Sequence, residues 1–141
     1  MRLWHYKLIS ALPNAQLKAM RYEIGDMAKQ YPNIKHRLVA YVNDQDIQYL
    51  LNYFIRVVDE FDRRGIKHKA DYDDNIYHIV DQKKKNMFVS LNLFYPEHND
   101  RYLKQCYYNL QEKWDRGIIS DTEWYEIEKI VKESDKTKEK L

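Results

Sequence analysis

A chain of 141 residues with 44% apolar content and a net charge of +2 has the size and composition of one compact domain with a single core. No stretch approaches the roughly 18 consecutive apolar residues of a membrane span, and the first residues lack the apolar core and cleavage site of a signal peptide. The single cysteine, Cys106, excludes an internal disulfide and suits a reducing compartment, so we expect a cytoplasmic protein without a membrane segment.

The first predicted helix covers residues 14–30. Asn14 follows Pro13 as a capping residue. One buried stripe then recurs at helical spacing, formed by Leu17, Met20, Ile24 and Met27. The sequence Tyr31-Pro32-Asn33 breaks the pattern, because the residue before a proline disfavours helical backbone.

The second predicted helix begins at a cap formed by Asn43 or Asp44 and ends at Gly65, a residue suited to the left-handed conformation that terminates helices. Its buried face is expected to contain Ile47, Leu50, Leu51, Phe54, Val58 and Phe61. Residues 66–85 are polar and are expected to form mainly loop, with a short helix around 76–80. They end in three lysines, 83–85, which are either solvated or in contact with a DNA backbone.

The third predicted helix runs over 99–116 and stops at Gly117. Ser120 and Glu123 have the spacing of a capping box and begin a last helix with Trp124 facing inward. Residues 86–96 form an ambiguous apolar run, and residues 133–141 are expected to be disordered. The prediction is therefore an all-α protein of about four main helices, with a single domain over 1–132 and a charged tail over 133–141.

Positive charge is concentrated near the N-terminus. Residues 1–40 contain seven lysines and arginines but only two acidic residues, Glu23 and Asp26. Acidic residues that lie more than about a Debye length away do not cancel the field of these local positive charges. This segment is either an ordinary solvated surface or one that contacts phosphates.

Glu23 and Gln16 lie two turns apart on the first predicted helix and flank its buried stripe on the same side. Ala19 lies between them and leaves room for a ligand to approach. Carboxylates at such half-buried positions can transfer protons. The alternative is a boundary glutamate that pairs with a lysine.

Four stretches carry a resemblance to a known family: MRLWHYKLISALPNAQLKAMRYEI, KHRLVAYV, YLLNYFIRVVDEFDRRGI and YPEHNDRYLKQCYYNLQEK. Together they resemble the pyrimidine dimer DNA glycosylases, over about residues 1–66 and 94–125. The opening MRLWH is the most specific part and is similar to the bacterial branch. The resemblance implies a helical fold of the endonuclease V type and a DNA repair glycosylase that is also an AP lyase.

The resemblance also implies a mechanism. The α-amine of the chain attacks C1′ of the damaged nucleotide, forms a Schiff base and then eliminates the 3′ phosphate. Met1 supplies that amine here, because Arg2 is too bulky for the usual removal of the initiator methionine, and Glu23 takes the role of the family's helix glutamate. In the phage enzyme a threonine supplies the amine instead. In the phage enzyme one arginine directly precedes the glutamate and another follows it by three residues. The corresponding residues here are Tyr22 and Asp26.

The remaining candidates are contacts to the substrate. Arg2, Gln16 and Arg21 match or neighbour the polar positions around the glutamate, and His5 near the amine is either a proton shuttle or a structural histidine. Lys35 and Arg37 are candidate phosphate contacts. The five histidines show no close paired spacing, so we expect no metal and no cofactor.

The expected partner is double-stranded damaged DNA, bound by a monomer. Two other functions stay open from the sequence. One is a non-catalytic DNA-binding module of the same fold, and the other is a helical protein-interaction domain.

Overall fold

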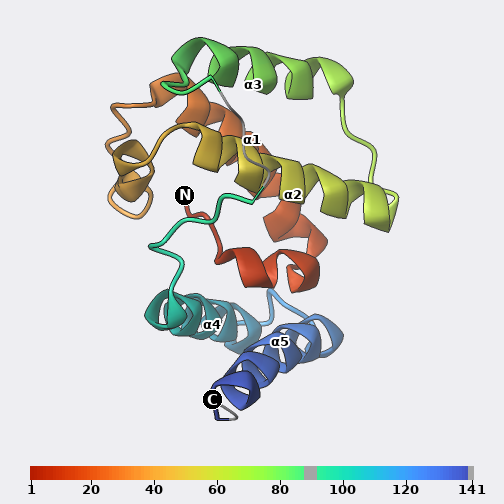
Figure 1. Ribbon diagram of the computed structural model, residues 1–141. Coiled ribbons are helices and arrows are strands. Elements are labelled where there is room, and N and C mark those ends of the chain that lie inside the picture. The colour runs from red at the N-terminus through yellow and green to blue at the C-terminus, as the bar shows by residue number, and fades with distance from the viewer. Residues whose placement is uncertain (88–91, 140–141) are drawn as a thin grey trace. The chain divides into compact units, whose positions relative to one another are not determined.

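The computed structural model describes residues 1–87 and 92–139, and every regular element in this part of the chain is a helix (Figure 1). The α-helices are α1 (Asn14–Gln30), α2 (Gln48–Arg64), α3 (Ala70–Lys83), α4 (Asp100–Asp115) and α5 (Asp121–Glu139), and two 3-10 helices are η1 (Tyr6–Ala11) and η2 (Ala40–Asp44). The all-α prediction is confirmed. Among the described helices, we find none with both the length and the apolar character of a membrane span.

Contacts between residues divide the chain into two units. Unit 1 joins Met1–Leu3 to Leu17–Tyr95, and unit 2 joins Trp4–Gln16 to Pro96–Leu141. Unit 1 therefore contains most of α1 together with η2, α2 and α3, whereas unit 2 contains η1, α4 and α5. The single domain over 1–132 stays a prediction.

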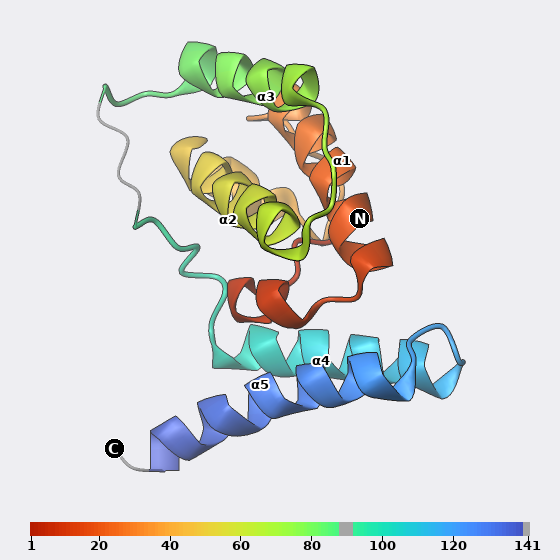
Figure 2. The same cartoon turned by 90° about the vertical axis from the view of Figure 1, so that its right-hand side faces the viewer.

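The core of unit 1 is built from α1, α2 and α3, which lie close together in both views of the ribbon (Figures 1 and 2). The stripe predicted on α1 is confirmed, since its four apolar side chains are at most 1% exposed. Tyr53 of α2 is also buried, and its hydroxyl donates to the sulfur of Met20 at 3.0 Å. The other buried apolar side chains include Ile47 just before α2, Leu50, Phe54, Val57 and Phe61 on α2, and Ile76 and Val80 on α3. Val58, predicted on the buried face of α2, is only half-buried, and the adjacent Val57 is buried instead.

The start of α2 differs from the prediction. Residues 40–44 form η2, and α2 begins at Gln48, whose N–H donates to the side chain of Asp46 at 3.0 Å. Asn43 does not cap the helix, because its side-chain amide bonds both the N–H and the C=O of Ile34 at 2.9 and 2.8 Å. The predicted end is confirmed: Gly65 has φ 71°, the left-handed conformation that favours glycine.

The loop predicted over 66–85 is wrong for most of that range, because residues 70–83 form α3. Ile76 and Val80 are buried one turn apart, and two apolar anchors among polar residues are too weak a pattern to reveal a helix. Lys83 is not simply solvated. Its ammonium group donates to the carbonyls of Ala28, Lys29 and Tyr31 at 2.7 to 2.8 Å, so it satisfies the C-terminal end of α1.

Unit 2 contains an antiparallel pair of helices, α4 and α5 (Figure 2). The N–H of Tyr102 donates to the Asn99 side chain at 2.9 Å, so Asn99 caps α4. The predicted capping box is confirmed, because Ser120 N–H donates to Glu123 Oε1 at 2.9 Å and Glu123 N–H donates to Ser120 Oγ at 3.2 Å.

The C-terminal segment also differs from the prediction. The structure continues α5 through Glu139, over residues for which the sequence predicts disorder. Asp135 forms an ion pair with Lys104 of α4 at 2.7 Å, and Ser134 accepts a hydrogen bond from Lys7 at 3.4 Å. This segment has no apolar face to bury, and the two long-range polar contacts connect it to α4 and η1 instead. Residues 140–141, and residues 88–91 of the ambiguous apolar run, lie outside the described residues.

Candidate active site

The N-terminal segment of unit 1 lies beside the middle of α1. Leu3 is fully buried and anchors this segment, while Met1 and Arg2 are half-buried. The backbone N–H of Arg2 donates to Glu23 Oε2 at 3.4 Å. Glu23 is half-buried, at the border of the apolar stripe of α1. The structure therefore brings the start of the chain and the helix glutamate together across 21 positions of sequence.

Covalent geometry extends this contact to the α-amine. Three bonds join the Met1 nitrogen to the Arg2 nitrogen, and standard bond lengths and angles keep the two within about 3.7 Å. Added to the 3.4 Å between the Arg2 nitrogen and Glu23 Oε2, this bounds the separation of amine and carboxylate at about 7 Å. One sugar ring can contact two groups at that separation.

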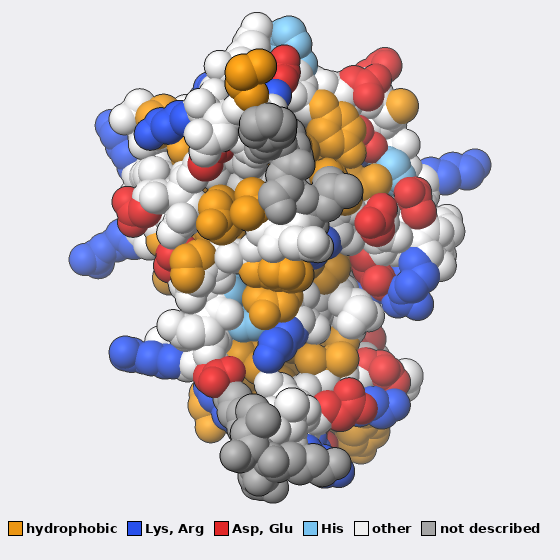
Figure 3. Space-filling view, viewed as in Figure 1, with side chains coloured by type: hydrophobic (Ala, Val, Ile, Leu, Met, Phe, Trp, Pro, Cys, Tyr) orange, Lys and Arg blue, Asp and Glu red, His pale blue; other side chains and the backbone are white. Residues whose placement is uncertain are grey.

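The predicted phosphate contacts are accessible. Lys35 and Arg37 are exposed in the segment between α1 and η2. On the face drawn in Figure 3, lysine and arginine side chains are interspersed with aspartate and glutamate. The DNA-binding roles of Arg2, Lys35 and Arg37 stay predictions.

Two predicted site residues, Gln16 and His5, belong to unit 2. Gln16 is half-buried, and its side-chain oxygen is buried without a hydrogen-bond partner among the described residues. The ring of His5 is buried and packs against those of His98 and Tyr102. Burial lowers the pKa of His5 to about 4, so the ring is neutral at pH 7. Its Nδ1 accepts the N–H of Lys7 at 3.1 Å, which leaves the proton on Nε2.

Arg21 is a second predicted contact that the structure finds buried, and its guanidinium forms an ion pair inside the protein. Its side chain is 4% exposed and pairs with Asp73 at 2.7 Å, and it also donates to the carbonyl of Lys69 at 3.1 Å. A guanidinium held in this way must leave its pair before it can reach a phosphate, and breaking a buried pair costs several kcal/mol, about 3–5. Its role in substrate binding stays a prediction.

His68 connects this pair to α2. Its two ring nitrogens lie 2.7 Å from Asp62 and 2.6 Å from Asp73. The hydrogen bond to Asp62, and then that to Asp73, raise the pKa of His68 against the opposing effect of burial. A histidine that donates from both nitrogens is protonated.

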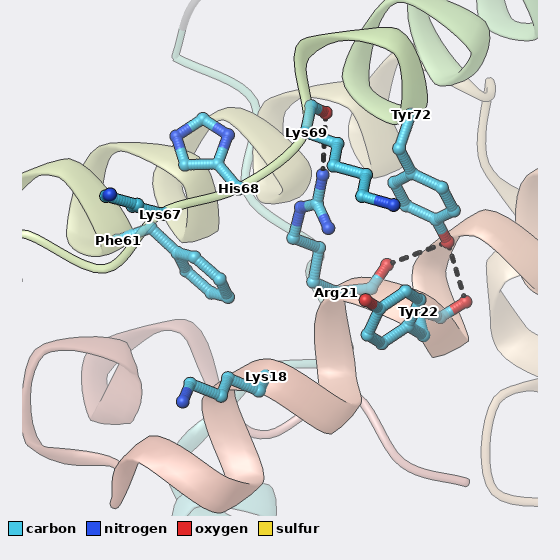
Figure 4. Close-up of a pocket in the computed structure, with 8 residues that line it drawn as sticks. All are labelled: Lys18, Arg21, Tyr22, Phe61, Lys67, His68, Lys69 and Tyr72. Atoms are coloured by element: carbon cyan, nitrogen blue, oxygen red, sulfur yellow. Dashed lines mark hydrogen bonds between the residues drawn. The ribbon is translucent and has the colours of Figure 1, made fainter.

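A pocket of about 550 Å³ opens beside this network. Figure 4 shows its lining, which is Lys18, Arg21, Tyr22, Phe61, Lys67, His68, Lys69 and Tyr72. At 100° per residue, the pocket residues of α1 point about 100–160° away from Glu23 around the helix. The pocket is thus separate from the N-terminal site. Across residues 1–87 and 92–139, no group of three or more His, Cys, Asp or Glu side chains is arranged to hold a metal ion.

The N-terminal part of the chain matches a known family. The model of the family described as pyrimidine dimer DNA glycosylase covers residues 1–74, more than half of the 141 residues. The chain belongs to the pyrimidine dimer DNA glycosylase family. The predicted family is therefore confirmed, and the family name implies glycosylase chemistry on DNA. No curated protein and no solved structure gives a significant match.

The family match contains both Met1 and Glu23, together with α1 and α2. The resemblance inferred over 94–125 lies outside it and stays a prediction. Sequence reasoning missed Gly25 of α1, and it missed Tyr72 and Asp73 of α3, which contact α1 in the structure. Gly25 was the available signal, because a glycine inside a helical pattern indicates a close approach by another group.

Proposed function

We propose that this member of the family is a DNA glycosylase with AP lyase activity on pyrimidine dimer-type lesions in double-stranded DNA. The Met1 α-amine is the nucleophile, and Glu23 is the acid–base and electrostatic group. The observation that carries the proposal is the 3.4 Å contact between the Arg2 nitrogen and Glu23, which keeps the amine close to the carboxylate.

An N-terminal amine is well suited to this reaction. As a class, α-amines have a pKa near 7.7–8.0, against about 10.4 for lysine side chains, so far more of the free base exists at neutral pH. The lone pair of the amine attacks C1′ of the damaged nucleotide and the C1′–N bond to the base breaks. Loss of a proton from the nitrogen and opening of the sugar ring then give the Schiff base.

Glu23 acts at two points of the reaction. Its carboxylate stabilises the positive charge that develops on the sugar as the base departs. The same Glu23 carboxylate then accepts the C2′ proton, and the electrons of that C–H bond expel the 3′ phosphate. Arg2, Lys35 and Arg37 supply positive charge to the phosphates that flank the lesion.

Borohydride trapping tests this function. A duplex with a single abasic site is incubated with the protein and sodium borohydride, which reduces a Schiff base to a stable amine. The proposal predicts a covalent protein–DNA adduct, which disappears when the N-terminus is acetylated or extended. A protein that binds the duplex but forms no adduct would instead be a non-catalytic DNA-binding module. A protein without affinity for DNA at low salt would be an interaction domain.

A further inference from the structure

Tyr72 of α3 approaches the backbone of α1 at Gly25. A Cβ atom built on Gly25 would lie 1.9 Å from the Tyr72 hydroxyl oxygen and 2.8 Å from Cζ, so no larger residue fits unless the tyrosine moves. Glycine is the least favourable residue in a helix interior apart from proline. A glycine in the middle of α1 is therefore explained by the space that it gives to this ring.

The Tyr72 hydroxyl reaches the peptide group that leads into Glu23. Its oxygen lies 3.1 Å from the carbonyl oxygen of Tyr22 and 3.4 Å from that of Arg21, as the dashed lines in Figure 4 show. The carbonyl carbon of Tyr22 is bonded to the Glu23 nitrogen, so the hydrogen bond restrains the peptide plane next to the glutamate. Burial raises the pKa of Tyr72, which keeps the hydroxyl protonated and able to donate.

The ring of Tyr72 is itself held in place. The guanidinium carbon of Arg21 lies 4.5 Å from its centroid, and the Tyr22 ring meets it edge-on at 5.4 Å. Arg21 is in turn fixed by its ion pair with Asp73, the residue after Tyr72. The first turn of α3 thus forms a rigid contact with one side of α1.

Glu23 is on the other side of the same turn. Gly25 follows it by two positions, which is about 200° around the helix, and the Glu23 carboxylate accepts the Arg2 N–H on its own side. We propose that Tyr72, packed against Gly25, is a positioning residue that fixes the turn of α1 from which Glu23 projects. This inference rests on the proposed function, because Tyr72 can affect the reaction through Glu23 only if Glu23 takes part in it.

The test compares single-turnover rates of adduct formation and strand cleavage on the abasic duplex. Tyr72→Phe removes only the hydroxyl, and Gly25→Ala drives a methyl group into it. Tyr72→Ala removes the ring, and Gly25→Ala/Tyr72→Ala places the methyl group where no ring obstructs it. Tyr77→Phe is the matched control, since Tyr77 is on the same helix, 38% exposed, and contacts the Phe54 ring edge-on. Duplex affinity and melting temperature are measured for each variant.

We expect Tyr72→Phe to lower the single-turnover rate about five- to tenfold with duplex affinity unchanged within twofold, because small displacements of a catalytic group cost rate rather than binding. Gly25→Ala should lower it at least as much. In the Tyr72→Ala background, however, Gly25→Ala should have no further effect, as coupled neighbours are non-additive. Tyr77→Phe should retain the wild-type rate.

Two results would overturn the inference, and they are distinguishable. If the wild-type protein forms no adduct, the proposed function fails and the positioning role fails with it. If the wild-type protein forms the adduct and Tyr72→Phe matches its rate at saturating duplex, with only a lower melting temperature, then Tyr72 is purely structural and the proposed function stands.

Discussion

The backbone N–H of Arg2 donates to the carboxylate of Glu23 at 3.4 Å, which ties the first residues of the chain to the middle of α1. This contact uses a main-chain donor, so it survives replacement of the Arg2 side chain. It keeps a primary amine and a carboxylate near one another. The predictions below separate the chemistry of this site from the charges and helix contacts around it.

Glu23→Gln tests the acid–base role. The amide is nearly isosteric and can still accept the Arg2 N–H, but it cannot take up a proton or offset a sugar cation. We expect strand cleavage to slow by about 10²–10⁴-fold, the usual range for loss of a general acid–base group. Duplex affinity should change less than twofold in a filter-binding titration. Full cleavage activity in this variant would assign the glutamate a structural role.

Asp73→Asn tests the buried ion pair. The change leaves the Arg21 guanidinium buried beside a neutral amide, so we expect the free energy of unfolding to fall by about 3–5 kcal/mol. Asp74→Asn, a change at the exposed neighbouring position of α3, should cost less than about 0.5 kcal/mol. Urea denaturation of the two variants gives the comparison, and equal losses would contradict the assigned importance of the pair.

The pH dependence of stability should reveal His68. Its pKa is raised in the folded protein, chiefly by the hydrogen bond to Asp62, so the folded state binds the proton more tightly than the unfolded state does. The resulting stabilisation is complete below the unfolded value near 6.5 and is lost as pH rises through the raised folded value. Urea titrations of wild type and His68→Gln between about pH 5.5 and 9 should converge toward high pH. A gap that widens with pH would show that the sign is wrong.

Lys35 and Arg37 are predicted to neutralise phosphates. Lys35→Ala/Arg37→Ala should reduce the slope of log K against log salt by about 1.8, because each phosphate contact contributes about 0.9. Arg101→Ala/Lys129→Ala removes the same two charge types from exposed positions of α4 and α5 and serves as the control. If the two double variants show the same slope, the segment between α1 and η2 does not contact the duplex.

Much of the fold follows from local sequence patterns. The buried stripe of α1, the end of α2 at Gly65 and the Ser120–Glu123 capping box each depend on residues within a few positions of one another. Such features can be predicted because their partners lie in the same turn or helix. The resemblance at the N-terminus supplied the family and, with it, Met1 and Glu23 as candidates.

The contacts across the chain could not be predicted in the same way. Lys83 belongs to a lysine run that looks solvated, yet it satisfies three carbonyls at the end of α1. Arg21 looks like a phosphate contact, but its partner is 52 positions away. The pattern of charges along the sequence does not show which cations are consumed inside the protein, because that depends on how helices pack.

Peptide mapping of the borohydride-trapped adduct tests the central claim most directly. The trapped protein is digested, and the peptide that carries the reduced sugar is identified by mass spectrometry. The account predicts that the sugar is attached to the α-nitrogen of Met1 and to no lysine. Attachment to the side chain of Lys7, Lys18 or any other lysine would contradict it.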